Sequence, residues 1–149
     1  MTNAPRPSLD LPGNETWVTY SDGAARGNPG PASYGAAVID PEGVLRDEIS
    51  VAIGVNTNNV AEYQGLIAAL EAALEHGARR VQARLDSELI VRQALGEYRV
   101  KHPGLLPLFS RLSQLRREFD DVSFRHVPRA QNKLADYLAN RALDREKLS

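Results

Sequence analysis

Four acidic side chains occupy positions where an acid is unusual. Asp22 follows a short apolar strand and, by the two-residue period of a strand, shares the face of Tyr20. Glu62 falls on the apolar stripe of a helix, Asp86 ends another apolar strand, and Asp136 lies in the last helix. A buried acid is costly unless a positive group meets it. Carboxylates that converge without cysteine or a histidine pair suit a hard divalent cation such as Mg²⁺.

Each acid taken alone also has an ordinary explanation. Asp22 precedes a glycine and can belong to a turn, and Asp86 can cap the helix that follows it. Asp136 can be a solvated residue on a helix surface. Glu62 is harder to explain in this way, because the rest of its stripe is apolar. The set of four, rather than any single acid, predicts a metal site.

Five predicted strands and four predicted helices must position these acids. Alternating or continuous apolar runs bounded by Gly and Pro predict strands over 17–21, 34–39, 44–51, 81–86 and 122–127. Helical spacing predicts helices over 58–76, 87–95, 105 or 107–119, and 130–143, with Asn58 and Asn59 capping the first. The order βββαβααβα predicts an α/β fold in which helices flank a five-stranded mixed sheet, three antiparallel strands followed by two parallel ones.

Length and composition predict one globular domain. The chain has 149 residues, of which 42% are hydrophobic and 25% charged. Residues 1–14 contain three prolines and no periodicity, which predicts a flexible N-terminal tail before a domain over 15–145. No apolar run reaches membrane-spanning length and no signal-peptide pattern is present, so we expect a cytoplasmic protein with no membrane partner.

Charge and motifs limit the function classes. The chain has no cysteine, which excludes disulfides and thiolate metal sites. The net charge of −1 argues at first against a nucleic-acid partner, but four acids reserved for metal would leave a basic excess. The Gly-rich run after Asp22 matches neither a P-loop nor a dinucleotide-binding motif.

Four motifs in order resemble type 1 ribonuclease H. Residues 20–23 with 27–31 and 34–35 are similar to the opening strand and turn of that family, and 57–62 to its Thr-Asn-Asn-x-x-Glu helix start. Residues 85–87 resemble its third acidic site. His126, ten residues before Asp136, with Asn132 between them, resembles its terminal histidine loop and last acid. The resemblance implies a ribonuclease H-like fold.

The resemblance also implies an activity. The family hydrolyses the RNA strand of RNA/DNA hybrids with two Mg²⁺ ions, leaving 5′-phosphate and 3′-hydroxyl ends, and Mn²⁺ is a possible substitute. Asp22 would bridge both ions, Glu62 and Asp86 would hold the leaving-group ion, and Asp136 would hold the ion on the nucleophile side. His126 would assist proton transfer or product release from a mobile loop; an ordinary surface or core histidine is the alternative.

Substrate contacts are implied for a second set of residues. Asn28, Asn58 and Asn59 match amides in the family that reach the minor groove, and Thr57 matches a residue that binds a DNA-strand phosphate. Further substrate contacts are expected at Ala25, whose backbone approaches the groove, and at Ser87 and Asn132. Helix capping is the alternative for Asn58 and Asn59. Arg99, Lys101 and Arg129 are candidate phosphate contacts, with solvated surface as the alternative.

One departure assigns the chain to a subgroup. Many bacterial members carry a basic, Trp-rich protrusion where this sequence has only residues 96–107. Glu88 also replaces an amide of the family. We expect a monomer without an obligate protein partner. The alternatives are another nuclease of the same fold, such as a junction resolvase or exonuclease, and a non-catalytic hybrid-binding module.

Overall fold

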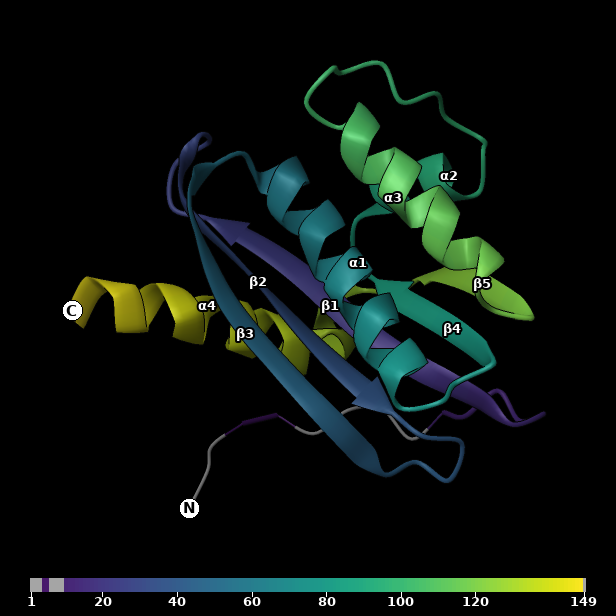
Figure 1. Cartoon of the computed structure of the whole chain (residues 1–149). Helices are drawn as coiled ribbons and strands as arrows, with labels where there is room; N and C mark the ends of the chain where they lie inside the picture. Colours follow the sequence, from purple (N-terminus) through teal and green to yellow (C-terminus); the bar gives the residue numbers. More distant parts are fainter. Residues whose placement is uncertain (1–3, 6–9, 149) are drawn as a thin grey trace.

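Five strands of the described chain form one mixed sheet in the order β3-β2-β1-β4-β5 (Figure 1). The computed structural model describes residues 4–5 and 10–148. The strands are β1 (Thr16–Ala25), β2 (Gly30–Ile39), β3 (Leu45–Asn56), β4 (Arg80–Leu85) and β5 (Asp121–His126). The pairs β1–β2 and β2–β3 are antiparallel, whereas β1–β4 and β4–β5 are parallel. The predicted fold class is confirmed.

The helices cover the sheet unequally (Figure 1). They are α1 (Asn58–Glu75), α2 (Glu88–Ala94), α3 (Leu106–Arg117) and α4 (Lys133–Leu148), with a 3₁₀ turn, η1 (Arg129–Gln131), before the last. The helices α1 to α3 lie on one side of the sheet, and α4 lies alone on the other. No helix among the described residues has the length and apolarity that a bilayer-spanning segment needs.

Each face of the sheet has its own apolar core. The apolar stripe of α1 is fully buried at Leu66 and Leu70, together with residues of β4, α2 and α3. On the opposite face, Val18 and Tyr20 of β1 pack against Leu138 and its neighbours in α4. Burial at this level contributes about 1.5–3 kcal/mol per large side chain. The two cores therefore fix α1 and α4 against opposite faces of β1.

The hairpin between β1 and β2 is tighter than the sequence predicts. The Gly- and Pro-rich run was expected to end the first strand at Ser21, but β1 continues to Ala25 and β2 begins at Gly30. The N–H of Arg26 donates to the carbonyl of Pro31 at 2.8 Å and closes the hairpin. Small residues 23–25 and 30–36 fit the paired backbones, so a composition that suggests a loop forms strand instead.

The first helix also begins differently from the prediction. Thr57, not Asn58 or Asn59, is the N-cap, because its Oγ1 accepts the N–H of Val60 at 3.2 Å. Asn58 and Asn59 are the first helical residues. The expected capping by these two asparagines is wrong. Threonine performs the same role, and both amide side chains are released for other contacts.

The segment before β1 contacts the sheet where it is described. Arg84 of β4 is 2% exposed; its guanidinium donates to the backbone carbonyl of Asp10 and to Tyr20 Oη. Arg125 of β5 donates to the Asp10 carboxylate at 3.0 Å. The predicted tail (1–14) falls partly outside the described residues, at 1–3 and 6–9, and its flexibility stays a prediction, as does the domain over 15–145.

Candidate functional site

Asp22 lies in β1 just beyond the point where β1 stops pairing with β4. It is not at the end of β1, as the sequence predicts, but is paired with Gly35 of β2 inside that hairpin. The parallel ladder between β1 and β4 ends one residue earlier, at Ser21 and Leu85. Asp22 is 6% exposed, and Gly23 N donates to its Oδ1 at 3.0 Å. The carboxyl group is thus held by a rigid strand at the point where β4 ends.

Glu62 approaches Asp22 because two glycines let α1 come close to β1. A Cβ at Gly23 would collide with the backbone nitrogen of Glu62 and with Ala61. A Cβ at Gly65 would lie 3.1 Å from the carbonyl oxygen of Asp22. Glu62 is 5% exposed, and its Oε2 has no hydrogen-bond partner among the described residues. The predicted position of Glu62 on the buried stripe of the helix is confirmed.

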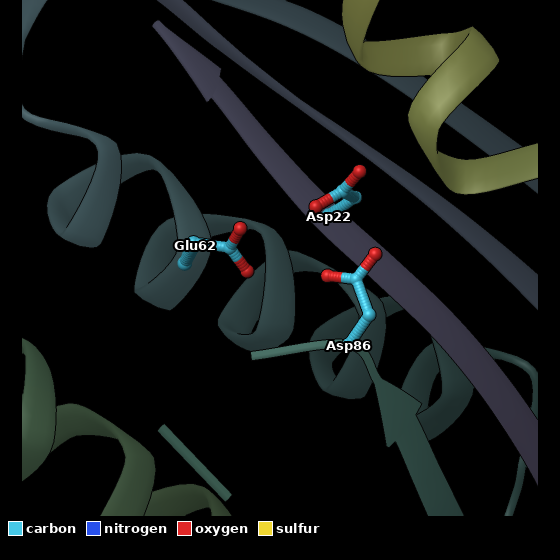
Figure 2. A group of neighbouring side chains, drawn as sticks. All are labelled: Asp22, Glu62 and Asp86. Atoms are coloured by element: carbon cyan, nitrogen blue, oxygen red, sulfur yellow. The ribbon is translucent and has the colours of Figure 1, made fainter. Parts of the chain in front are cut away.

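Asp86 completes a group of three carboxyl groups. It follows the last residue of β4 and is half-buried. Figure 2 shows Asp22, Glu62 and Asp86 converging from β1, α1 and the end of β4. One carboxylate oxygen from each lies within 4.8 Å of the others. Three acids far apart in the sequence therefore face one small space.

Asp136 lies near this group but outside it. It is half-buried in the first turn of α4, and its backbone N–H donates to Asn132 at 3.1 Å. With the other three acids it lines a depression of about 450 Å³. The depression is lined by Asp22, Gly23, Ala24, Ala25, Asn58, Glu62, Asp86, Ser87, Arg129, Asp136 and Asn140. The structure thus gathers all four sequence-predicted acids around one hollow.

Burial and mutual repulsion disfavour ionisation of these acids. Burial raises the pKa of Asp22 well above its usual range, and the charges of Glu62, Asp86 and Asp136 add to the effect. Burial likewise raises the pKa of Glu62 to about 7, with a further contribution from Asp86. Burial also raises the pKa of Asp86. Such a site lacks positive charge, which a bound cation would supply.

The side chain of Arg129 supplies some positive charge near these acids. It is exposed in η1 and lines the depression. Its positive charge opposes the rise in the pKa of Glu62 and of Asp86, although burial outweighs it in both. Arg99 and Lys101, the other candidate phosphate contacts, are exposed in the segment between α2 and α3 and are not among the described lining residues. Arg129 is the best placed of the three.

His126 adjoins the site without lining it. His126 is the last residue of β5 and pairs with Leu85, as the predicted strand over 122–127 requires, so the loop that the resemblance implies can begin only after it. Its Nε2 lies 3.3 Å from the backbone oxygen of Asp86, and the residue is exposed. It lines a neighbouring depression between α2 and β5. The role of His126 stays a prediction.

The predicted substrate contacts gather along one rim. Ala25, Asn58 and Ser87 line the depression. Asn28 Oδ1 accepts the N–H of Asn58 at 3.1 Å, which ties the β1–β2 hairpin to the start of α1. Thr57 and Asn59 are half-buried beside them. Thr57 and Ser87 each also cap a helix. Their contacts with substrate stay a prediction.

Asn132 is an exception. It is 1% exposed, and its Nδ2 donates to the backbone oxygen of Ser21 at 2.9 Å. This burial leaves little of the side chain accessible, and its contact with substrate stays a prediction. The side chain connects the segment before α4 to β1, one residue from Asp22. Its position supports the site from behind.

Asn140 is a residue of the site that the sequence does not reveal by motif. Its Nδ2 donates to both the backbone oxygen and Oδ1 of Asp136, at 3.0 and 3.1 Å. The available signal is its spacing, since residues four apart lie on one face of a helix. Gly65 was likewise missed, because only the packing of α1 on β1 shows its role.

Replacement of Gly23 by alanine is expected to disrupt the site. The added methyl group would meet the backbone of α1, which cannot rotate away, so we expect a loss of about 1–3 kcal/mol in the free energy of unfolding. Glu62 would also move away from Asp22. Denaturant unfolding and a divalent-metal titration of the folded protein measure both effects.

Gly77→Ala is the matched control for Gly23→Ala. Gly77 follows α1 at the opposite end, with φ of +89° and open space where an added Cβ would lie. Alanine there costs conformational stability without moving Glu62. Gly23→Ala with native metal affinity would show that the close approach of α1 is dispensable.

Comparisons with known sequences agree with this arrangement. The sequence family described as "Reverse transcriptase-like" matches residues 20–142. "Bifunctional protein Rv2228c" of Mycobacterium tuberculosis is 49% identical over 129 residues, which cover 85% of this chain and 35% of that protein. "Ribonuclease HI" of Halobacterium salinarum is 47% identical over 125 residues, 84% of this chain and 63% of that protein. The chain thus spans about a third of the first relative and under two thirds of the second.

A solved structure has the same fold at similar identity. LC11-RNase H1, isolated from compost and solved in complex with an RNA/DNA hybrid, superposes with a TM-score of 0.84 at 44% identity. The match covers 90% of this chain and 100% of that one. The similarity therefore extends over most of the chain rather than over isolated motifs.

Proposed function

Because the chain belongs to the type 1 ribonuclease H family, we propose that it hydrolyses the RNA strand of RNA/DNA hybrids. The observation that carries this proposal is the convergence of Asp22, Glu62 and Asp86 within 4.8 Å of one another. Asp136 on the wall of the same depression supplies the fourth acid. A binding module has no need to hold such mutually repelling groups together.

The acids fit divalent cations. All ligand atoms offered are carboxylate oxygens, and Oε2 of Glu62 is buried with no hydrogen-bond partner among the described residues. Burial raises the pKa of Glu62, and a bound cation would favour its ionised form. We propose Mg²⁺ as the ion, two in number, with Mn²⁺ as a substitute. Asp22 would contact both ions, Glu62 and Asp86 the one at the leaving group, and Asp136 the one at the nucleophile. Bound ions of this kind activate water and stabilise a leaving oxygen.

The remaining residues of the site position the substrate and its protons. Arg129, exposed on the rim, can neutralise the phosphate that is cleaved. His126, beside the backbone of Asp86, can take up or deliver a proton as the products leave. The products proposed are a 5′-phosphate and a 3′-hydroxyl. The chain requires no partner protein in this proposal, and we propose a monomer acting in the cytoplasm.

Recognition of the hybrid is proposed along the rim formed by the hairpin and α1. The hydrogen bond between Asn28 and Asn58 joins these two elements, and Ala25 brings backbone to the depression. Amide and backbone groups placed there can contact ribose 2′-hydroxyls and base edges in a minor groove. Such contacts depend on duplex shape, so we propose cleavage with little sequence preference.

The test of this function compares three duplexes. End-labelled RNA/DNA, RNA/RNA and DNA/DNA duplexes of one sequence are incubated with Mg²⁺ or with a chelator, and the products are resolved by length. We expect cleavage of the RNA strand of the hybrid, dependent on Mg²⁺. Degradation from one end only would indicate an exonuclease, cleavage of branched DNA alone a resolvase, and binding without cleavage a hybrid-binding module.

Mg²⁺ is expected to stabilise the folded protein. An ion that binds only the native state adds about 2.7 kcal/mol at one hundred times its Kd, which raises Tm by several degrees. Differential scanning fluorimetry at constant ionic strength measures the shift, with Na⁺ as the control for screening. An unchanged Tm at millimolar Mg²⁺ would contradict the proposed metal site.

A further inference from the structure

The backbone of Asp136 is fixed by the packing of α4 on the sheet. The hydroxyl groups of Ser33 and Ser50 donate to the carbonyls of Ala139 and Leu138, both at 2.5 Å. Gly35, the cross-strand partner of Asp22, lets the α4 backbone approach β2 so closely that a Cβ there would collide with it. These contacts place the first turn of α4 beside Asp22. They do not determine where the Asp136 carboxyl group points.

The Asp136 carboxyl group has a hydrogen-bond partner in its own helix, Asn140. Within the described residues, the Asp136 carboxyl group accepts one side-chain hydrogen bond, from Asn140 Nδ2 at 3.1 Å. The same nitrogen donates to the Asp136 backbone oxygen at 3.0 Å. Because one amide group bonds both the backbone and the carboxyl group of Asp136, it restricts rotation of the acid's side chain.

The other three acids do not depend on Asn140. Asp22 is held by its strand and by Gly23 N, and Glu62 by the packing of α1. Asp86 follows β4 directly. Asp136 lies on α4, which carries none of the other three acids. It is outside the group of carboxylate oxygens that lie within 4.8 Å of one another. Its contribution to the depression can therefore be changed through the hydrogen bond from Asn140 without moving the other three acids.

We propose that Asn140 is a positioning residue that directs the Asp136 carboxyl group into the depression and thereby sets the affinity of the site for divalent cations. The proposal rests on the proposed function, because it presumes that the four acids bind metal. Asp136 and Asn140 both line the depression that the other three acids line, which places the hydrogen-bonded pair at the site.

The physical reason is preorganisation. A carboxylate that rotates freely must lose that freedom when it binds a cation, whereas one held by a hydrogen bond has already lost it. Groups that orient a metal ligand typically change metal affinity or activity by about 10–100-fold when they are removed. Asn140 touches neither the proposed ions nor the cleaved bond in this role, so it acts through Asp136.

Three variants test the proposal. Asn140→Ala removes the donor, Asn140→Leu keeps the approximate shape without it, and Asn140→Gln retains an amide that can reach a carboxylate four residues away on a helix. Alanine and leucine are better helix formers than asparagine, so loss of α4 is not expected. Gln114→Ala, which removes an exposed amide from α3, is the matched control.

The readouts are Mn²⁺ affinity without nucleic acid, by isothermal titration calorimetry, and the kcat and KM for hybrid cleavage. We expect Asn140→Ala and Asn140→Leu to weaken Mn²⁺ binding about ten-fold and to lower kcat at limiting metal, with KM for the hybrid within two-fold of native. Asn140→Gln should recover most of the affinity, and Gln114→Ala should match the native protein.

The outcomes separate this inference from the proposed function. Native metal affinity in Asn140→Ala and Asn140→Leu, in protein whose wild type binds metal and cleaves the hybrid, would overturn the inference alone. A loss of affinity that glutamine does not restore would also overturn it, because the hydrogen bond would not be the cause. Wild-type protein that neither binds metal nor cleaves the hybrid would instead overturn the proposed function.

Discussion

Replacement of Asp22 by asparagine is expected to lower the rate of hybrid cleavage by on the order of 10³-fold, the scale seen when one preorganised electrostatic group is lost. Asp22 is the acid on which the charges of Glu62, Asp86 and Asp136 all act. Asparagine keeps the size of the side chain but contributes no negative charge. The loss should therefore appear in kcat at saturating hybrid rather than in KM.

A matched control for Asp22→Asn is available at Asp40. The two aspartates are 6% and 5% exposed, and Asp40 lies in the turn between β2 and β3 rather than in the depression. Asp40→Asn should cleave the hybrid at the native rate per folded molecule. A single-turnover assay on both variants, with folding checked by circular dichroism, makes the comparison. Asp22→Asn with a kcat within ten-fold of native would refute a central role for Asp22.

The second large effect of Asp22→Asn is expected on stability, which the substitution should increase. In metal-free buffer at pH 8, Asp22→Asn should be more stable than the native protein by about 1–3 kcal/mol, the usual cost of burying an uncompensated polar or charged group. Burial and three neighbouring acids raise the pKa of Asp22, so its ionised form opposes folding. Removing the charge removes that opposition. Urea unfolding with a chelator present measures the difference.

The pH dependence follows from the direction of this shift. Below pH about 4, Asp22 is protonated in both the folded and the unfolded chain and contributes nothing. Between pH 4 and its raised folded pKa, the folded state binds more protons than the unfolded state. The free energy of unfolding therefore falls as pH rises through that range. Asp22→Asn should flatten this slope, and an unchanged slope would place the destabilising charge elsewhere.

The pKa of Asp40 is shifted in the opposite direction from that of Asp22, so its effect on stability has the opposite sign. Burial alone would raise its pKa, but hydrogen bonds from the N–H groups of Val44 and Glu42, together with Arg46, hold it below its usual value. Its ionised form therefore stabilises the fold at neutral pH, and that stability is lost as pH falls through the folded pKa. Asp40→Asn should accordingly lower the free energy of unfolding at pH 8, where Asp22→Asn raises it.

Much of the fold followed from local pattern. The helical stripe of Leu66 and Leu70 and the alternation before Asp86 predicted α1 and β4, because burial of one face imposes a period that sequence displays. The extents of β1 and β2 could not be predicted in this way. Their small residues read as a turn, and only cross-strand pairing, such as Asp22 with Gly35, shows that they continue as strands.

The same division applies to the site. An acid on an otherwise apolar stripe is visible in sequence, which is why Glu62 and, with the other motifs, Asp22, Asp86 and Asp136 could be identified. The sequence does not show when a polar side chain is buried between two elements. Only the structure shows that the amide of Asn132, a predicted substrate contact, is enclosed against Ser21. Capping by Thr57 rather than by the asparagines after it likewise depends on the entry angle of the chain.

The sequence by itself determined which acids are candidates for the site and the order of the elements that carry them, because residue type and periodicity are local properties. The tertiary structure alone decided how close these acids come. That distance depends on Gly23 and Gly65 between β1 and α1 and on Gly35 beneath α4, where the absence of a side chain lets backbones approach. The tertiary structure also shows that Asn140 is a hydrogen-bond partner of Asp136. Such a bond between two polar residues exists only once the helix and its surroundings are in place.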